Sequence, residues 1–368
     1  MTKTILCIVG TRPEAIKMAP VILALRREPW AKVVVVATAQ HRELADEVLS
    51  LFGIEPDVDL DLMQPNQKLA DLTARALVGL DRVIGDTSPD MVIAQGDTTS
   101  VMAAATACFY RQVPFLHVEA GLRSFDMQNP FPEEFNRIVA SRIATLHFAP
   151  TASARRHLLD EKVPDGDIVV TGNTVIDALH MVAAQDLPLP VDIDPGRRLV
   201  LVTVHRRENF GEPIQGICRA IRTLVEEHDD VEVLWPVHPN PNVTGVAHET
   251  LGSNPRIHLV KPQPYGGFVA AMKRAHLILS DSGGVQEEAP ALARPVLVLR
   301  RETERPEAIE AGVVRLIGTD TDVILRHGRE LLRDADAYRR MARGESPYGD
   351  GHASERIVDA IKARFLAS

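Results

Sequence analysis

The sequence predicts an α/β protein built from two doubly wound parallel-sheet domains that face a cleft. Apolar runs that read as strands alternate with helical stretches along almost all of the 368 residues. Runs such as residues 4–9 and 91–95 are continuously apolar and lack a two-residue period, which indicates strands covered on both faces. The alternation stops in a Pro-rich stretch, residues 163–198, and then restarts, so a chain of this length is expected to form two sheets.

The first half of the chain provides the first sheet. Its expected strands are residues 4–9, 32–38, 91–95, 113–118 and 146–149, and its expected helices begin near residue 13, cover 42–52, 67–85 and 101–110, and begin again at 133. Asp57, Asp59 and Asp61 alternate along a short segment, and we interpret them as the solvated face of a short strand and not as a metal-binding motif.

The second half repeats the alternation. Its expected strands are residues 199–204, 231–237, 256–260, 277–280, 295–299 and 313–317, with helices at 212–227 and 265–274. A last helix, 353–365, is long enough to cross back over the first domain. We therefore predict domains at 1–170 and 171–352, followed by a returning helix in 353–368, with the ligand in the cleft between the two sheets.

Composition excludes several classes of protein. A net charge of -9 argues against a nucleic-acid binder, and three cysteines without a CxxC pair provide neither a disulfide framework nor a thiolate zinc site. The histidines form no HxH or HExxH motif, so we expect no metal. Neither GxGxxG after the first strand nor a P-loop is present, which argues against a nicotinamide cofactor. Without a signal-peptide pattern or about 18 continuous apolar residues, we expect a cytoplasmic protein and no membrane span.

The most specific local signal is the segment SDSGGVQEE, residues 280–288. A predicted strand runs directly into Ser282, Gly283 and Gly284, and a helix follows. Two glycines allow close approach of the backbone, and a helix start offers free N–H groups, which together suit a diphosphate. Glu288, about two turns in, could accept from ribose hydroxyls. The alternative is a glycine turn with an N-capping serine.

Acidic and basic side chains follow the strand ends of the first domain. Asp97 and Glu119 end successive strands, so a parallel sheet would bring them close together, and Glu133 would join them from the long loop that follows Glu119. Crowded carboxylates suit acid/base chemistry, although Asp97 could instead cap the following helix. We interpret Glu134, the neighbour of Glu133, as a solvated surface charge that points away.

Four further residues could hold an anion or act on a substrate. Arg12 and Lys17 lie at the end of the first strand and in the helix behind it, where two cations could bind a phosphate, although an exposed helical lysine is the alternative for Lys17. His205 closes the first strand of the second domain and could donate to a substrate oxygen. Arg305 follows a strand end and precedes a proline, so it too could reach an anion.

Nine motifs then make a family recognisable. In chain order they are GTRPEAIKMAP, TAQHRE, QGDTTS, HVEAGLRS, PEEFNR, TGNTVIDAL, HRREN, SDSGGVQEEAP and TERPEA. Over almost the whole chain the sequence resembles the non-hydrolysing UDP-N-acetylglucosamine 2-epimerases. The resemblance implies a fold of the glycosyltransferase-B type, interconversion of UDP-N-acetylglucosamine and UDP-N-acetylmannosamine without a cofactor, and a homodimer.

The resemblance also implies roles for individual residues. Asp97, Glu119 and Glu133 would be the catalytic acids, with His205 beside the phosphates and the sugar. The implied substrate-binding residues are Arg12, Lys17, Arg137, Gln263, Phe268, Ser282, Gly283, Gly284, Glu288 and Arg305, of which Gln263 and Phe268 would flank the uracil. Gln40, His41 and Gln67 match an allosteric UDP-N-acetylglucosamine site of the family, where Asn66 stands in place of an arginine found in some members.

The chemistry explains the need for several acids. The hydrogen at C2 of the sugar lies next to no carbonyl, so we expect UDP to leave C1 as a base removes the C2 proton, giving a 2-acetamidoglucal to which UDP adds again. A glycosyltransferase of the same architecture and a UDP-sugar sensor without turnover remain alternatives.

Overall fold

A computed structural model describes residues 2–38, 42–63 and 67–366, and the side chains of all of these except residues 42–44. The chain forms two compact units: Met1–Ala178 together with Tyr348–Ser368, and Leu179–Pro347. Residues 171–178 and 348–352, which the sequence assigned to the second domain, thus belong to the first unit.

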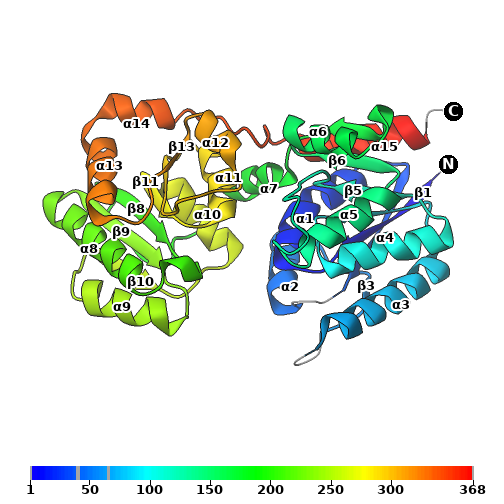
Figure 1. Ribbon diagram of the computed structural model, residues 1–368, viewed down its shortest axis with the longest axis horizontal. Helices are drawn as coiled ribbons and strands as arrows, with labels where there is room; N and C mark the ends of the chain where they lie inside the picture. The colour runs from blue at the N-terminus through cyan, green and yellow to red at the C-terminus, as the bar shows by residue number, and fades with distance from the viewer. Residues whose placement is uncertain (1, 39–41, 64–66, 367–368) are drawn as a thin grey trace. The chain divides into compact units, whose positions relative to one another are not determined.

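The first unit contains a seven-stranded sheet in the order β3-β2-β1-β4-β5-β6-β7, and every pairing in it is parallel. Its strands are β1 (Lys3–Val9), β2 (Ala31–Ala37), β3 (Val58–Asp59), β4 (Met91–Gln95), β5 (Phe115–Val118), β6 (Leu146–Ala149) and β7 (Ile168–Val170). Its helices are α1 (Arg12–Arg26), α2 (Arg42–Leu51), α3 (Leu69–Thr87), α4 (Thr99–Arg111), α5 (Glu133–Ile143), α6 (Ala152–Asp160) and α15 (Ala353–Phe365), with a 3-10 turn at Asp165–Asp167 (Figure 1).

The second unit contains a six-stranded parallel sheet in the order β10-β9-β8-β11-β12-β13. Its strands are β8 (Arg198–Thr203), β9 (Val231–Pro236), β10 (Ile257–Val260), β11 (Leu277–Ser280), β12 (Val296–Val298) and β13 (Val314–Leu316). Its helices are α8 (Glu212–Glu227), α9 (Pro241–Leu251), α10 (Tyr265–Arg274), α11 (Gly283–Ala291), α12 (Pro306–Glu310), α13 (Thr321–Arg333) and α14 (Ala335–Met341), with a 3-10 turn at Arg207–Asn209, and α7 (Thr174–Ala183) contains the boundary between the units.

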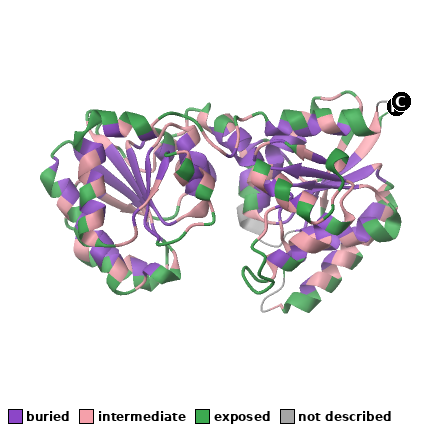
Figure 2. Ribbon diagram, turned by 45° about the horizontal axis from the view of Figure 1, so that its top comes forward, coloured by how far each residue is buried: buried purple, intermediate pink, exposed green. Residues whose placement is uncertain are grey.

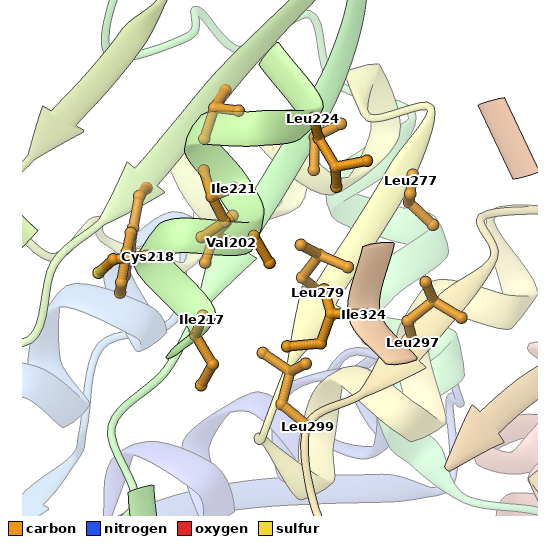
Figure 3. Close-up of a cluster of buried hydrophobic side chains, with 14 of the residues drawn as sticks. Val202, Ile217, Cys218, Ile221, Leu224, Leu277, Leu279, Leu297, Leu299 and Ile324 are labelled. Carbon is orange, nitrogen blue, oxygen red and sulfur yellow. The ribbon is translucent and has the colours of Figure 1, made fainter. Parts of the chain in front are cut away.

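Both sheets are buried on both faces, as the continuous apolar runs predict. Figure 2 shows most of the strand residues in the colour of buried residues, with partly exposed ones at the edge strands β3, β7 and β10, whereas the helices alternate between buried and exposed faces. In the second unit, Val202, Leu279 and Leu297 from three strands pack against Ile217 and Ile324 from the covering helices (Figure 3). This core holds the strands rigid and so fixes where their ends present side chains.

Each sheet has one point at which the strand order reverses. In the first unit the chain moves outward from β1 to β2 and β3, then returns to β4 on the other side of β1. The second unit does the same between β8 and β11. Ligands of open parallel sheets bind beyond the carboxyl ends of the strands at such a reversal. The loops after β1, β4, β8 and β11 are therefore the first places to look for a site.

The sequence-based prediction was wrong for part of the fold. The stretch 163–198 was predicted as linker, but it contains β7 and α7, and its longest part without regular structure is the one between α7 and β8. The helices α6, α9, α12, α13 and α14 were not predicted. The short strand at the Asp57 to Asp61 segment and the last helix are confirmed as β3 and α15.

The last helix is tied into the first unit by a buried carboxylate. Asp177 of α7 accepts hydrogen bonds from the backbone amides of Ala353 (3.1 Å) and Ser354 (2.7 Å), so it satisfies the free N–H groups at the start of α15. The helix then packs against α1.

Candidate active site

Asp97 lies just beyond β4, and Arg137 of α5 neutralises it. The guanidinium Nη2 is 2.5 Å from the Asp97 carboxylate, and the Asn136 side chain donates to the Asp97 backbone carbonyl at 2.8 Å. Thr98, and not Asp97, is the N-cap of α4, because its hydroxyl accepts from the Val101 amide. The helix-cap alternative for Asp97 is thereby rejected, and its carboxylate is oriented from α5.

Glu119 lies at the end of the neighbouring strand β5 and has its own cation. Lys17 of α1 places its Nζ 2.5 Å from the Glu119 carboxylate, and the Gln95 side chain donates to the same carboxylate at 3.0 Å. Glu119 also has a φ of 62°, a backbone conformation that costs energy for a residue with a side chain. Lys17, which the sequence assigned to a phosphate, is in this structure the partner of an acid.

The two acids at the start of α5 differ in their surroundings. Glu133 is partly exposed and has no hydrogen bond or ion pair with another described residue. Glu134 is 1% exposed and accepts from the backbone amides of Ser124 and Phe125 and from Arg137, each at 3.1 Å. The interpretation of Glu134 as a solvated charge was therefore wrong, because the loop before α5 folds back over the side of the helix that Glu134 faces.

A further buried acid lies at the end of β1. Glu14, 3% exposed, accepts from the amides of Gly10 (2.5 Å) and Thr11 (3.1 Å) and forms a capping box with Thr11. Burial raises the pKa of Glu14 to about 7, against the opposing effect of the Thr98 hydroxyl and these amides. Arg12, the first residue of the same helix, is partly buried and makes no hydrogen bond or ion pair with a described residue.

A neutral histidine supports the turn that carries Asp97. The His117 ring is 1% exposed, and its Nε2 lies 2.7 Å from the Gly96 carbonyl oxygen. Burial lowers the pKa of His117 to about 4, so the ring stays uncharged at neutral pH. It therefore acts as a structural donor behind the acids and not as a proton carrier.

In the second unit, the Gly-rich turn leads from β11 directly into α11. Ser282 occupies the N-cap position, but its side chain makes no capping hydrogen bond. The alternative of an N-capping serine therefore does not apply. A Cβ atom on Gly283 would lie 2.8 Å from the guanidinium carbon of Arg305, which shows how closely that side chain covers the turn. Arg305 is in turn held by Glu287, 2.6 Å from its Nε. The free N–H groups of the helix start and the Arg305 guanidinium thus lie side by side, an arrangement that can bind an anion.

The other predicted residues of this unit lie on α10 and α11. Glu288 is 7% exposed and accepts a hydrogen bond from the Tyr265 hydroxyl at 2.7 Å. Gln263, just before α10, donates to the Lys261 carbonyl, and Phe268 lies within the helix, partly buried. Tyr265 thus fixes the carboxylate that we assigned to ribose.

His205 follows β8, and its side chain is 42% exposed. Its Nδ1 lies 3.1 Å from the carboxylate of Asp281, which is buried just before Ser282. The parallel pairing of Thr203 with Ser280 places the ends of β8 and β11 at one edge, so His205 and the Gly-rich turn belong to the same group.

The residues assigned to an allosteric site are only partly described. Gln40, His41 and Asn66 lie outside the described residues. Gln67 accepts a hydrogen bond from Arg75 at 2.5 Å and its amide lies 3.8 Å from the Met63 sulfur.

Sequence reasoning missed Glu14, Gln95, Tyr265 and Asp281 and misinterpreted Glu134, and all five bind or orient a predicted residue or the turn beside it. One of them had a readable signal, because Thr11 and Glu14 have the spacing of a capping box. The others depend on contacts between segments far apart in the chain.

Among the described residues, no three His, Cys, Asp or Glu side chains are grouped so that they could hold a metal ion. In the same part of the chain, no helix has the length and apolar content needed to cross a bilayer.

The fold and these groups define a class: two-domain parallel-sheet proteins of the glycosyltransferase-B type, with strand-end carboxylates in one unit and a Gly-rich helix start beside an arginine in the other. A glycosyltransferase from Streptomyces nogalater has the same fold, with a TM-score of 0.62 at 17% identity over 100% of both chains.

The family follows from closer relatives. The sequence model of the family described as UDP-N-acetylglucosamine 2-epimerase matches residues 23–362. The UDP-N-acetylglucosamine 2-epimerase of Escherichia coli K12 is 48% identical over 97% of this chain and 98% of its own. The Neisseria meningitidis enzyme, solved bound to UDP-GlcNAc, superimposes with a TM-score of 0.86 at 44% identity and covers 98% of this chain and 100% of its own. The chain belongs to the UDP-N-acetylglucosamine 2-epimerase family, a family of isomerases.

Proposed function

We propose that this protein interconverts UDP-N-acetylglucosamine and UDP-N-acetylmannosamine by elimination and readdition of UDP. Carrying the family's substrate over to this chain is supported by 48% identity over 97% of its length. The observation that supports the chemistry most directly is the pair of carboxylates at the ends of β4 and β5, each with its own cation.

The reaction is redox-neutral and needs no cofactor. A base removes the proton from C2 while the bond between C1 and the diphosphate oxygen breaks, which yields UDP and a 2-acetamidoglucal. UDP then adds to C1 as an acid returns a proton to the other face of C2. We assign this acid/base work to Asp97, Glu119 and Glu133, because side chains on both faces of the sugar are required.

The cations beside the acids have a defined task in this scheme. Arg137 and Lys17 bind the carboxylates of Asp97 and Glu119 and so hold them in a fixed orientation. Glu133 has no such cation beside it among the described residues. His205 would donate to the departing diphosphate.

The nucleotide would be held by the second unit. The amides at the start of α11 and the guanidinium of Arg305 would bind the diphosphate. Glu288, oriented by Tyr265, would accept from ribose, and Gln263 and Phe268 would flank the uracil. UDP must stay bound through the elimination, since its loss would release the glycal.

The Asp97→Asn variant tests the assignment of the acids. We expect UDP binding within about twofold of the wild type and turnover lowered by at least about a hundredfold, as typical for loss of an acid/base group. Turnover is followed by proton NMR of UDP-N-acetylglucosamine without any acceptor sugar. A variant with normal turnover would remove Asp97 from the mechanism, and accumulation of free N-acetylmannosamine by the wild type would indicate a hydrolysing enzyme.

We also propose that the protein is a cytoplasmic homodimer. Cys7, Cys108 and Cys218 are all buried and free, in keeping with a reducing compartment. On α4, Phe109 and Tyr110 are 66% and 65% exposed, which leaves apolar area for a second copy. Light scattering coupled to size-exclusion chromatography measures the mass directly, and a mass of one chain would contradict the dimer.

A further inference from the structure

Asp281 is a charged side chain with no access to solvent. It follows β11, directly before the Gly-rich turn, and is 0% exposed. Its carboxylate accepts from the backbone amides of His205 (3.0 Å) and Arg206 (2.9 Å) and from the Asn209 side chain (2.9 Å). Although burial raises the pKa of Asp281, the hydrogen bonds from the His205 ring and these amides outweigh burial and hold it below its ordinary value. The side chain is thus a buried anion.

One of the partners of this anion is the imidazole of His205. Nδ1 lies 3.1 Å from the carboxylate, so Nδ1 carries a proton and donates it. The ring is partly exposed, and the His238 ring stacks near it, with centroids 6.2 Å apart. With Nδ1 engaged, Nε2 is the nitrogen left to meet a ligand.

We propose that Asp281 is a positioning residue that acts through His205: it fixes the ring and its Nδ1–H tautomer, so that Nε2 faces the ligand of the Gly-rich turn. This inference rests on the proposed function, in which His205 meets the departing diphosphate. Asp281 itself touches no reacting atom.

The contacts favour this role over a purely structural one in which Asp281 only holds the loop after β8. For that structural role, hydrogen bonds from the amides of residues 205 and 206 and from the Asn209 side chain, which restrain the backbone, would suffice. The additional bond to Nδ1 restrains the ring itself. A carboxylate on Nδ1 stabilises the one tautomer that leaves Nε2 without a proton when the ring is neutral and able to donate when it is charged.

The first test uses the unaltered protein. ¹⁵N NMR of histidine-labelled protein, with the signal assigned by its loss in His205→Asn, reports which ring nitrogen is protonated when the ring is neutral. We expect the Nδ1–H tautomer in the wild type and the Nε2–H tautomer in Asp281→Asn, whose amide group can donate to Nδ1. An Nε2–H ring in the wild type would overturn the proposal, whether or not any variant folds.

The second test is a double-mutant cycle on kcat. We expect Asp281→Asn to lower kcat by about a hundredfold, the effect of a misplaced catalytic group, and the double variant with His205→Asn to be no slower than His205→Asn alone. Losses that multiply would show that Asp281 acts independently of His205 and would overturn the proposal.

Asn209→Ala is the matched control, because it removes a donor to the same carboxylate without touching the ring. It should lower the unfolding temperature, as Asp281→Asn does, but leave kcat within about threefold of the wild type, as expected for a change away from the reacting groups. An equal loss of kcat in Asn209→Ala would show that Asp281 only holds the loop after β8, and would overturn the proposal. Failure of the proposed function is distinguishable, since a wild type that does not epimerise would still show the tautomer.

Discussion

Replacing Glu134 by glutamine should destabilise the first unit. The side chain is buried and accepts three hydrogen bonds, two from the amides of Ser124 and Phe125 and one from Arg137. Glutamine keeps one oxygen but places an amide group against a donor, and it removes the charge opposite Arg137. Leaving one buried donor unsatisfied and weakening one charged hydrogen bond costs about 3 kcal/mol together.

The change is measurable as a shift in unfolding temperature. For a domain of about 200 residues, about 3 kcal/mol corresponds to a decrease of about 6 to 12 °C in Tm. Differential scanning calorimetry measures this shift. Since Arg137 also holds Asp97, kcat should decrease as well.

The neighbouring residue provides the control. Glu133→Gln should change stability by less than about 0.5 kcal/mol, because Glu133 is partly exposed and has no hydrogen bond to a described residue, while kcat falls sharply. The reasoning would be refuted if Glu134→Gln had the wild-type Tm, or if both variants lowered it equally.

The pH dependence follows from the same contacts. Burial raises the pKa of Glu134, but the hydrogen bonds from the Ser124 amide, Arg137 and the Phe125 amide together lower it by more, so the pKa lies below its ordinary value. A depressed folded pKa contributes stability that is present above the unfolded pKa and lost as the pH falls through the folded pKa. In a plot of unfolding free energy against pH, the loss at acidic pH that Glu134 causes in the wild type should be absent from Glu134→Gln.

Two further predictions concern the turn in the second unit and the end of β1. Gly283→Ala should weaken UDP binding about tenfold or more in calorimetric titration and leave the unfolding temperature unchanged. The new methyl group would displace the flexible guanidinium of Arg305 and so weaken its charged hydrogen bond to the diphosphate. An unchanged affinity for UDP would contradict this. Burial raises the pKa of Glu14 from 4.5 to about 7, so the folded state keeps a proton that the unfolded state releases, and stability should fall by about 3 kcal/mol as the pH rises through this window. Denaturant titrations at pH 5 and pH 8 should show this difference in unfolding free energy in the wild type and not in Glu14→Gln. A difference that persists in Glu14→Gln would show that another group causes it.

Much of the fold was predictable because its rules are local. Continuous apolar runs predict buried parallel strands, and a parallel sheet gathers the residues that follow its strands at one edge. That is why Asp97 and Glu119 could be placed at neighbouring strand ends, where the structure has them. The edge strand β7 was missed since Ile168–Val170 is too short to give a clear pattern.

The partners of the site residues could not be predicted in the same way. Helix geometry correctly separates the directions of Glu133 and Glu134, but it does not tell what a preceding loop will cover. Likewise, Asp281 and His205 are 76 residues apart in the chain, and their contact depends on the pairing of β8 with β11. The types of site residue follow from sequence, whereas the contacts that orient them follow from tertiary structure.

The central claim is that the C2–H bond of the sugar breaks during turnover. The most direct measurement is incubation of the protein with UDP-N-acetylglucosamine in deuterated water, without an acceptor, followed by NMR at C2. We predict deuterium at C2 of both UDP-N-acetylmannosamine and the recovered UDP-N-acetylglucosamine, with Asp97→Asn giving neither at a comparable rate. Epimer that forms with its C2 hydrogen retained, or a substrate that acquires no label, would contradict the account.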